Sequence, residues 1–217
     1  MPEPIEEALA SALSDSCRIG QILLRATDSG FVILHRDDEQ KANLCEYGDP
    51  EEAIEIARYD DGGNHRPLKT APNLRHGWKL KLGNLNDLRR ALDHFYPGRL
   101  AIFIARRHNR LATTPLRETL ERQSGMYRVA ATISDEQIDE VVGDFCRSED
   151  GCLRTILWKR DQSESVPSAK LPREKFDPLQ DQAGAQGLSS AGTMIPLLCQ
   201  EACNLLVAEC RRAVKGE

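Results

Sequence analysis

Aromatic residues are scarce, at 5% of the 217 residues, which argues against a stacking platform for single-stranded nucleic acid. An excess of basic charge is also missing, because 29 Lys and Arg face 34 Asp and Glu. No apolar run reaches the length of about 18 residues that a membrane span needs. The acidic first residues lack the basic start of a secretory signal. We therefore expect a cytoplasmic protein that binds neither nucleic acid nor membranes.

Cysteine, in contrast, is plentiful, with seven residues in the chain. An odd number in a chain expected in a reducing compartment argues against a full set of disulfides. Four of the seven form two close pairs, Cys146 with Cys152 and Cys199 with Cys203. Clustered cysteines in an intracellular chain are more often metal ligands than disulfide partners. The pairs are therefore the candidate metal ligands of this sequence.

The spacing of the second pair bears on the kind of metal. We predict a helix over 194–214, with Pro196 in its first turn, so that Cys199 and Cys203 project from one face about 6 Å apart along the axis. Such a separation suits a cubane, in which each thiolate binds a different iron. A single zinc ion needs all its sulfurs about 2.3 Å from one point. The spacing favours an iron–sulfur cluster, with zinc or ordinary buried cysteines as the alternatives.

The remaining cysteines and the histidines give weaker signals. Cys210 lies about 10.5 Å beyond Cys203 along the predicted helix, so we interpret it as a core residue. Cys17 and Cys45 are interpreted as core or surface thiols. None of the five histidines pairs with another at a spacing of four residues, and we interpret them as surface or capping residues. Four cations flank the cysteines and would raise the potential of an anionic cluster, namely Arg147, Arg154, Lys159 and Arg160.

Hydrophobic periodicity and capping residues predict the secondary structure. Helices are predicted over 3–14, 50–59, 84–95, 114–123, 134–146 and 194–214. Strands are predicted over 19–27, 31–35, 78–82, 100–105 and 126–133, and residues 153–158 are apolar enough to be buried. The Ser-, Gln-, Pro- and Gly-rich stretch 161–193 is predicted to be a flexible linker.

Several of these segments together resemble a known bacterial domain pair. Gly125–Tyr127, Ser134–Gln137, Cys146, Cys152–Trp158 and Cys199–Asn204 resemble the 4Fe-4S cluster-binding domain that accompanies a cobalt-chelatase module in multidomain proteins. Those proteins are similar to the sirohydrochlorin cobaltochelatases of cobalamin biosynthesis. Glu55–Asp61, Arg66–Arg75 and Gly77–Trp78 resemble their companion stabilising domain. The resemblance covers roughly 15–160 and 194–212.

The resemblance implies an α+β protein with two parts. Residues 1–98 would form a small α/β stabilising-type domain, and residues 99–217 a mixed α/β domain that binds a [4Fe-4S] cluster through Cys146, Cys152, Cys199 and Cys203. The sequence has no room for the chelatase module, so we expect no independent catalytic activity. The implied function is an accessory or partner in tetrapyrrole metallation, with a sirohydrochlorin chelatase-type protein as its partner. The alternatives are an electron-transfer or redox enzyme subunit and a zinc-stabilised interaction module.

Overall fold

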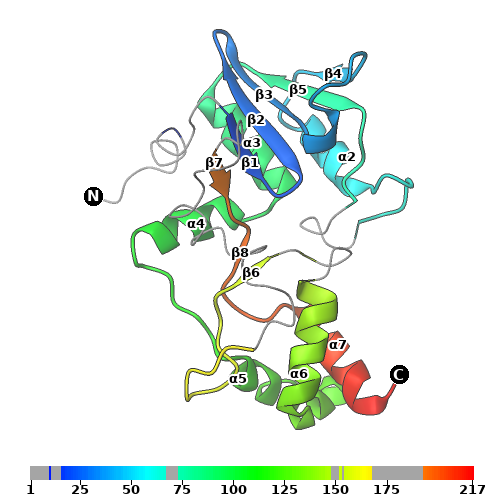
Figure 1. Ribbon diagram of the computed structural model, residues 1–217, viewed down its shortest axis with the longest axis vertical. Helices are drawn as coiled ribbons and strands as arrows, with labels where there is room; N and C mark the ends of the chain where they lie inside the picture. The colour runs from blue at the N-terminus through cyan, green and yellow to red at the C-terminus, as the bar shows by residue number, and fades with distance from the viewer. Residues whose placement is uncertain (1–9, 11–15, 67–72, 148–151, 153, 168–192) are drawn as a thin grey trace.

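The computed structural model describes residues 10, 16–66, 73–147, 152, 154–167 and 193–217. Apart from residue 10, the predicted helix over 3–14 lies outside these residues, as does most of the predicted linker. The described chain has an upper part built around a sheet and a lower part built from short helices (Figure 1). The α+β class expected from the sequence is confirmed. No helix in the described ranges is long and apolar enough to cross a membrane.

A six-stranded mixed sheet forms the upper part. Its order is β4 (Cys45–Tyr47), β5 (Trp78–Leu82), β3 (Gly30–His35), β2 (Ile22–Thr27), β1 (Ser16–Ile19) and β7 (Thr193–Ile195). The central strands β2 and β3 form a hairpin, in register from Thr27 opposite Gly30 to Ile22 opposite His35. The outer strand β7 pairs in parallel with β1. A segment near the C-terminus therefore completes a sheet that begins near the N-terminus.

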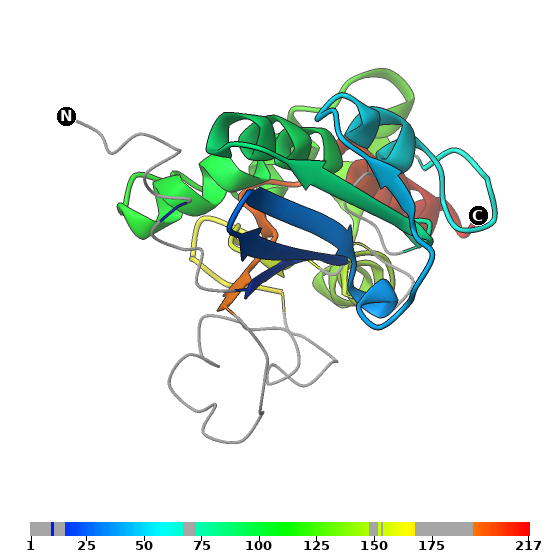
Figure 2. The same cartoon turned by 90° about the horizontal axis from the view of Figure 1, so that it is seen from above.

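Helices α2 (Glu52–Arg58) and α3 (Leu85–Phe95) lie on the same side of this sheet (Figure 2). Helix α3 begins where the sequence predicts, because the Asn84 side chain accepts a hydrogen bond from the Asp87 amide. Its buried face includes Phe95, whose ring stacks on Trp78 of β5 with centroids 5.1 Å apart. These contacts bury the first hydrophobic core between the sheet and the two helices.

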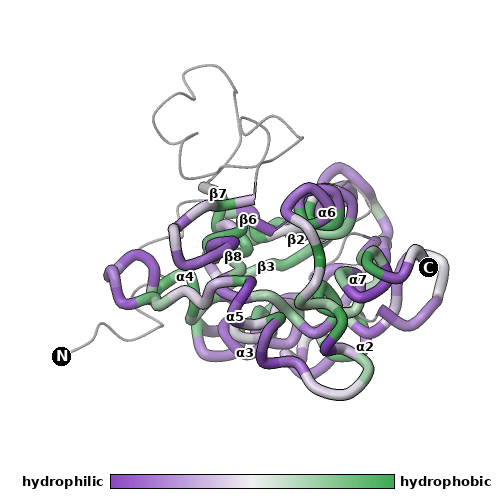
Figure 3. Tube along the Cα trace, turned by 90° about the horizontal axis from the view of Figure 1, so that it is seen from below, coloured by the Kyte–Doolittle hydropathy of each residue, from purple (hydrophilic) through white to green (hydrophobic). Residues whose placement is uncertain are grey.

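The lower part contains the second hydrophobic core. It is built from α5 (Leu116–Glu121), the 3₁₀ segment η2 (Gly125–Thr132), α6 (Asp135–Val141), the π-helical turn η3 (Val142–Cys146) and α7 (Asn204–Lys215). Two short parallel strands, β6 (Thr155–Ile156) and β8 (Leu198–Cys199), lie between the two parts. Figure 3 shows hydrophobic segments along β2, β3 and β8, whereas much of α5 and α6 is hydrophilic.

Three predicted elements are wrong. Residues 100–105 belong to helix α4 (Arg99–Arg107), because a short apolar run does not by itself distinguish a strand from a helix. Residues 126–133 are mostly 3₁₀ helix. The predicted helix over 194–214 is instead β7, then β8, and only then α7 from Asn204. Pairing with β1 and β6 holds the first part of that stretch extended.

Candidate metal centre

The four cysteines of the two predicted pairs line one pocket. Cys146 ends η3, Cys152 follows it, Cys199 ends β8, and Cys203 is the N-cap residue of α7. The pocket encloses about 280 Å³ of empty space, part of it open to solvent. Its other lining residues are Phe145, Arg154, Ile156, Trp158 and Leu206. Two segments that lie far apart in the chain thus bring four sulfur atoms to one place.

The first pair is positioned by α6 and the turn after it. Ser134 and Gln137 form a reciprocal capping box that fixes the start of α6, as the sequence predicts. The helix then widens into the π-helical turn η3, a distortion often found at functional sites. The amide of Cys152 donates a hydrogen bond to the Phe145 carbonyl over 3.1 Å. That bond folds the chain back so that Cys152 lies beside Cys146.

The second pair is held by β-pairing and a helix start, which corrects the predicted geometry. Cys199 lies opposite Ile156 in the β6–β8 pair, and its carbonyl accepts a hydrogen bond from the Leu157 amide over 2.9 Å. Cys203 caps α7, and its sulfur accepts a hydrogen bond from the Leu206 amide over 3.5 Å. The two cysteines therefore flank a turn and do not share a helix face.

Burial makes the first pair costly to ionise. It raises the pKa of Cys152 to about 11, although nearby Arg154 acts in the opposite direction. Burial also raises the pKa of Cys146 well above its usual range, and the other three cysteines raise it further. Four negative thiolates would repel one another in this pocket, so they need a bound positive centre. Metal ions supply this positive charge, and a thiol that coordinates a metal ion is deprotonated outright.

Two further observations fit an anionic sulfur-rich cluster. Trp158 lines the pocket, and its buried indole Nε1–H has no hydrogen-bond partner among the described residues. Arg99 of α4 donates from Nη1 to the Leu198 carbonyl over 2.9 Å. Burial lowers the pKa of Arg99, as does Arg154, while Cys199, Cys203 and Cys152 act to raise it. The indole N–H of Trp158 and the cations Arg99 and Arg154 thus lie near the four sulfur atoms.

Only some of the four cations that flank the cysteines in the sequence lie near this pocket. Arg154 lines it. Arg160 instead contacts Asp135 and Asp139, and Lys159 pairs with Glu164. Arg147 lies near enough to Cys146 to lower its pKa. Sequence reasoning missed Arg99, since it lies about fifty residues before Cys146 in the sequence and only the packing of α4 brings it close to the pocket.

The other cysteines lie elsewhere. Cys210 is fully buried in the second core and does not line the pocket, which confirms its interpretation as a core residue. Burial raises its pKa to about 12. Cys17 is fully buried in the first core, and Cys45 is exposed.

The interpretation of the histidines needs one correction. His35 does cap the short 3₁₀ turn η1 (Arg36–Asp38), because its Nδ1 accepts a hydrogen bond from the Asp37 amide. It is nevertheless fully buried, beside His76 and Asp38. Burial, followed by the nearby His76, lowers the pKa of His35 to about 4. The spacing His35-x₂-Asp38 after a strand was the one sequence signal for this group.

Comparison with known protein families finds two domain models that match the chain. Residues 108–212 match the model of the 4Fe-4S iron-sulfur cluster binding domain, and residues 6–107 match that of the DR2241 stabilising domain. The chain therefore combines a 4Fe-4S cluster-binding domain with a stabilising domain of this kind, which confirms the resemblance and the cofactor expected from the sequence. The boundary predicted at 98/99 stays a prediction.

Among solved structures, the chain is similar to DR2241 from Deinococcus radiodurans, with 29% identity and a TM-score of 0.75. That protein is described as a multi-domain protein with structural similarity to chelatases and with two additional novel domains. The similarity covers 98% of this chain but 41% of DR2241, so the chain spans about two-fifths of that protein's length. No protein with a curated description matches.

Proposed function

We propose that Cys146, Cys152, Cys199 and Cys203 ligate one [4Fe-4S] cluster, and that the protein is a non-catalytic accessory or partner in cobalamin or tetrapyrrole metallation. The observation that carries the ligand assignment is the convergence of these four cysteines on one pocket. Cys17, Cys45 and Cys210 do not line it. The family match supplies the identity of the cofactor.

The residues around the pocket support a bracing role for the cluster. Cys146 and Cys152 come from one segment, while Cys199 and Cys203 come from a second segment that follows residues 168–192 in the sequence. The β6–β8 pair that joins the segments has only two residues in each strand. A bound cluster supplies iron–thiolate bonds that close this long loop, and its binding free energy then contributes to folding.

Similarity to DR2241 supports the metallation context. That protein is described as similar to chelatases, and the part of it that this chain does not cover leaves room for such a module. The two domains that this chain carries would then act together with a chelatase-type module. We therefore propose a sirohydrochlorin chelatase-type protein as the partner.

Chemical analysis of the protein purified without oxygen tests the cluster. We expect about four iron and four acid-labile sulfide per chain, since the site holds one cubane. One zinc per chain with no sulfide would overturn the assignment and would support the zinc-stabilised module instead.

Single substitutions test the ligands. We expect Cys→Ser at each of positions 146, 152, 199 and 203 to lower the iron and sulfide content. The matched controls are Cys45→Ser at an exposed site and Cys210→Ala at a buried one, and both should retain the full cluster. Full iron and sulfide in any of the four Cys→Ser variants would remove that residue from the ligand set.

The metallation role needs a separate test with the chelatase. We expect the cluster-loaded protein to bind a sirohydrochlorin chelatase, measured by calorimetry, and to alter its rate of metal insertion. The cluster-free Cys146→Ser variant is the control. Neither binding nor a change of rate would reject this role while leaving the cluster assignment intact.

Electron transfer is the second candidate. The observation that favours it is the partial exposure of Cys199 and Cys203, which places one side of the pocket near solvent. Arg99 and Arg154 would stabilise the more negative, reduced state. A reversible one-electron reduction at a potential accessible to cellular donors would support this role, and its absence would reject it.

A further inference from the structure

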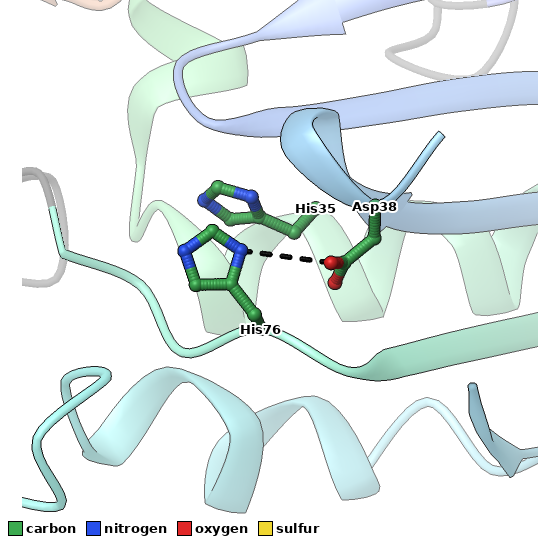
Figure 4. Close-up of side chains that lie close together, drawn as sticks. All are labelled: His35, Asp38 and His76. Atoms are coloured by element: carbon green, nitrogen blue, oxygen red, sulfur yellow. Dashed lines mark ion pairs between the residues drawn. The ribbon is translucent and has the colours of Figure 1, made fainter. Parts of the chain in front are cut away.

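A second group of ligand-type side chains lies beside the ends of two strands of the sheet, among residues that do not line the cysteine pocket. His35 ends β3, Asp38 ends η1, and His76 lies two residues before β5. Strands β3 and β5 are antiparallel neighbours, with Leu34 opposite Lys79. This pairing brings the end of β3 next to the start of β5, so that the three side chains converge (Figure 4).

The three residues are close enough to share one ion. One ligand atom of each lies within 4.8 Å of the corresponding atoms of the other two. His76 Nδ1 is 3.6 Å from Asp38 Oδ1, and the two imidazole centroids are 4.0 Å apart. The side chains of His35 and Asp38 are 1% and 0% exposed, whereas that of His76 is 30% exposed. An ion would reach the group past His76.

Two imidazole nitrogens in this group are buried without hydrogen bonds. His35 Nε2 and His76 Nδ1 have no hydrogen-bond partner among the described residues, whereas Asp38 Oδ1 lies 2.8 Å from the Lys41 ammonium. The second oxygen of Asp38 is already held, because Oδ2 accepts a hydrogen bond from the Gly77 amide over 2.6 Å. Buried polar atoms without partners are costly and call for an explanation such as a bound ion.

A carboxylate also lies behind His76, on the side away from Asp38. Asp61 Oδ2 is 4.0 Å from His76 Nε2, and Asp61 Oδ1 accepts a hydrogen bond from the His76 amide over 3.3 Å. Histidines that bind metal through one ring nitrogen usually direct the other towards a carboxylate. The arrangement therefore leaves Nδ1 of His76, the nitrogen that faces Asp38, as the ligand atom.

We propose that His35, Asp38 and His76 bind one divalent transition-metal ion of the Zn²⁺ class. Two imidazoles and one carboxylate suit such an ion, whereas Mg²⁺ and Ca²⁺ prefer sites made only of oxygen ligands. Three protein ligands leave an open coordination position on zinc. The Lys41 ammonium now lies 2.8 Å from Asp38 Oδ1 and is the nearest cation to this oxygen among the residues that the structure describes. Its side chain is 55% exposed, so it can swing into solvent when the ion binds.

The test is equilibrium dialysis of the full chain against ZnCl₂, performed without oxygen on cluster-loaded protein whose sulfide content is checked before and after. We expect one Zn²⁺ per chain. His76→Ala and Asp38→Asn should each weaken binding by at least about 10-fold, since even changes outside the ligand shell cost about 10- to 100-fold. The matched control is His94→Ala, since His94 also lies beside a carboxylate, with its Nε2 3.2 Å from Glu51.

Lys41→Met gives an opposite and independent readout. Removing the competing ammonium should tighten Zn²⁺ binding several-fold. Thermal unfolding without Zn²⁺ checks that each variant folds, and His76→Gln replaces His76→Ala if the latter does not. The proposal is overturned if the wild-type protein binds no Zn²⁺, or if the His76 and Asp38 variants bind it as tightly as the His94→Ala control. Weaker binding by Lys41→Met would also overturn it.

Discussion

Ile156 and Cys199 lie opposite each other in the parallel pair β6–β8. The Thr155 amide donates to the Leu197 carbonyl over 3.0 Å, and the Leu157 amide donates to the Cys199 carbonyl over 2.9 Å. This short ladder sets the register between the two cysteine-bearing segments. Backbone hydrogen bonds thus bring the candidate ligands together, and a bound cluster would have to reinforce only a small contact.

Removal of iron should loosen this contact first. We expect an iron chelator to speed hydrogen exchange of the amides in β8 and the first turn of α7, because metal ligation there contributes to local stability. Amides of β2 and β3, in the centre of the six-stranded sheet, should be unaffected. Hydrogen–deuterium exchange with mass spectrometry measures both. Equal acceleration in β2 and β3 would contradict a local bracing role.

Arg99→Gln should lower the reduction potential of the cluster. The substitution removes a positive charge that interacts with Cys199 and Cys203. For a partly exposed pair this is worth about 1 kcal/mol, which for a one-electron couple corresponds to a shift on the order of tens of millivolts. Redox titration followed by electron paramagnetic resonance measures the shift. Arg106→Gln, at an exposed position on the same helix, is the control and should leave the potential unchanged.

Ser134→Ala should destabilise the lower part by about 1 kcal/mol, since it removes the N-cap hydrogen bond to the Gln137 amide. Ser124→Ala is a matched control, because Ser124 is the N-cap of η2 but makes no side-chain capping bond. Denaturant unfolding of the two variants checks the difference. Equal midpoints would show that the capping box contributes nothing measurable.

Gly30→Ala should destabilise the sheet by at least about 2 kcal/mol. Gly30 has a φ of +136°, and a Cβ there would lie 2.1 Å from the Leu82 carbonyl oxygen. Gly48→Ala is the control, since a Cβ at Gly48 meets nothing within 4 Å. Thermal unfolding distinguishes them, and a Gly30→Ala protein as stable as Gly48→Ala would contradict the steric account.

Local signals predicted the elements whose ends are marked by side chains. Asn84 before α3 and the Ser134–Gln137 box before α6 are visible in the sequence because a cap bond spans only three residues. Helix α4 lacks such a mark, since its N-cap is Gly98 in the left-handed region, with no side chain to form a cap bond. Its apolar run was therefore mistaken for a strand.

A candidate ligand set could be proposed from the sequence, but not the way in which the fold brings the four cysteines together. Cysteine spacing and family resemblance selected Cys146, Cys152, Cys199 and Cys203. The turn between Cys199 and Cys203 depends on pairing of β8 with β6, a long-range contact that periodicity does not encode. The same holds for Arg99 and for the group of His35, Asp38 and His76, which only the packing of separate elements brings together.

Strand β7 has a consequence for how the chain can be divided. It belongs by position to the cluster-binding half, yet it forms the outer edge of the sheet beside β1. A fragment cut after residue 107, the end of the stabilising-domain match, would leave the backbone of β1 open along that side. An unprotected sheet edge recruits other chains. Excision at the family boundary therefore favours oligomers, and supplying the missing strand as a peptide should return the fragment to a monomer.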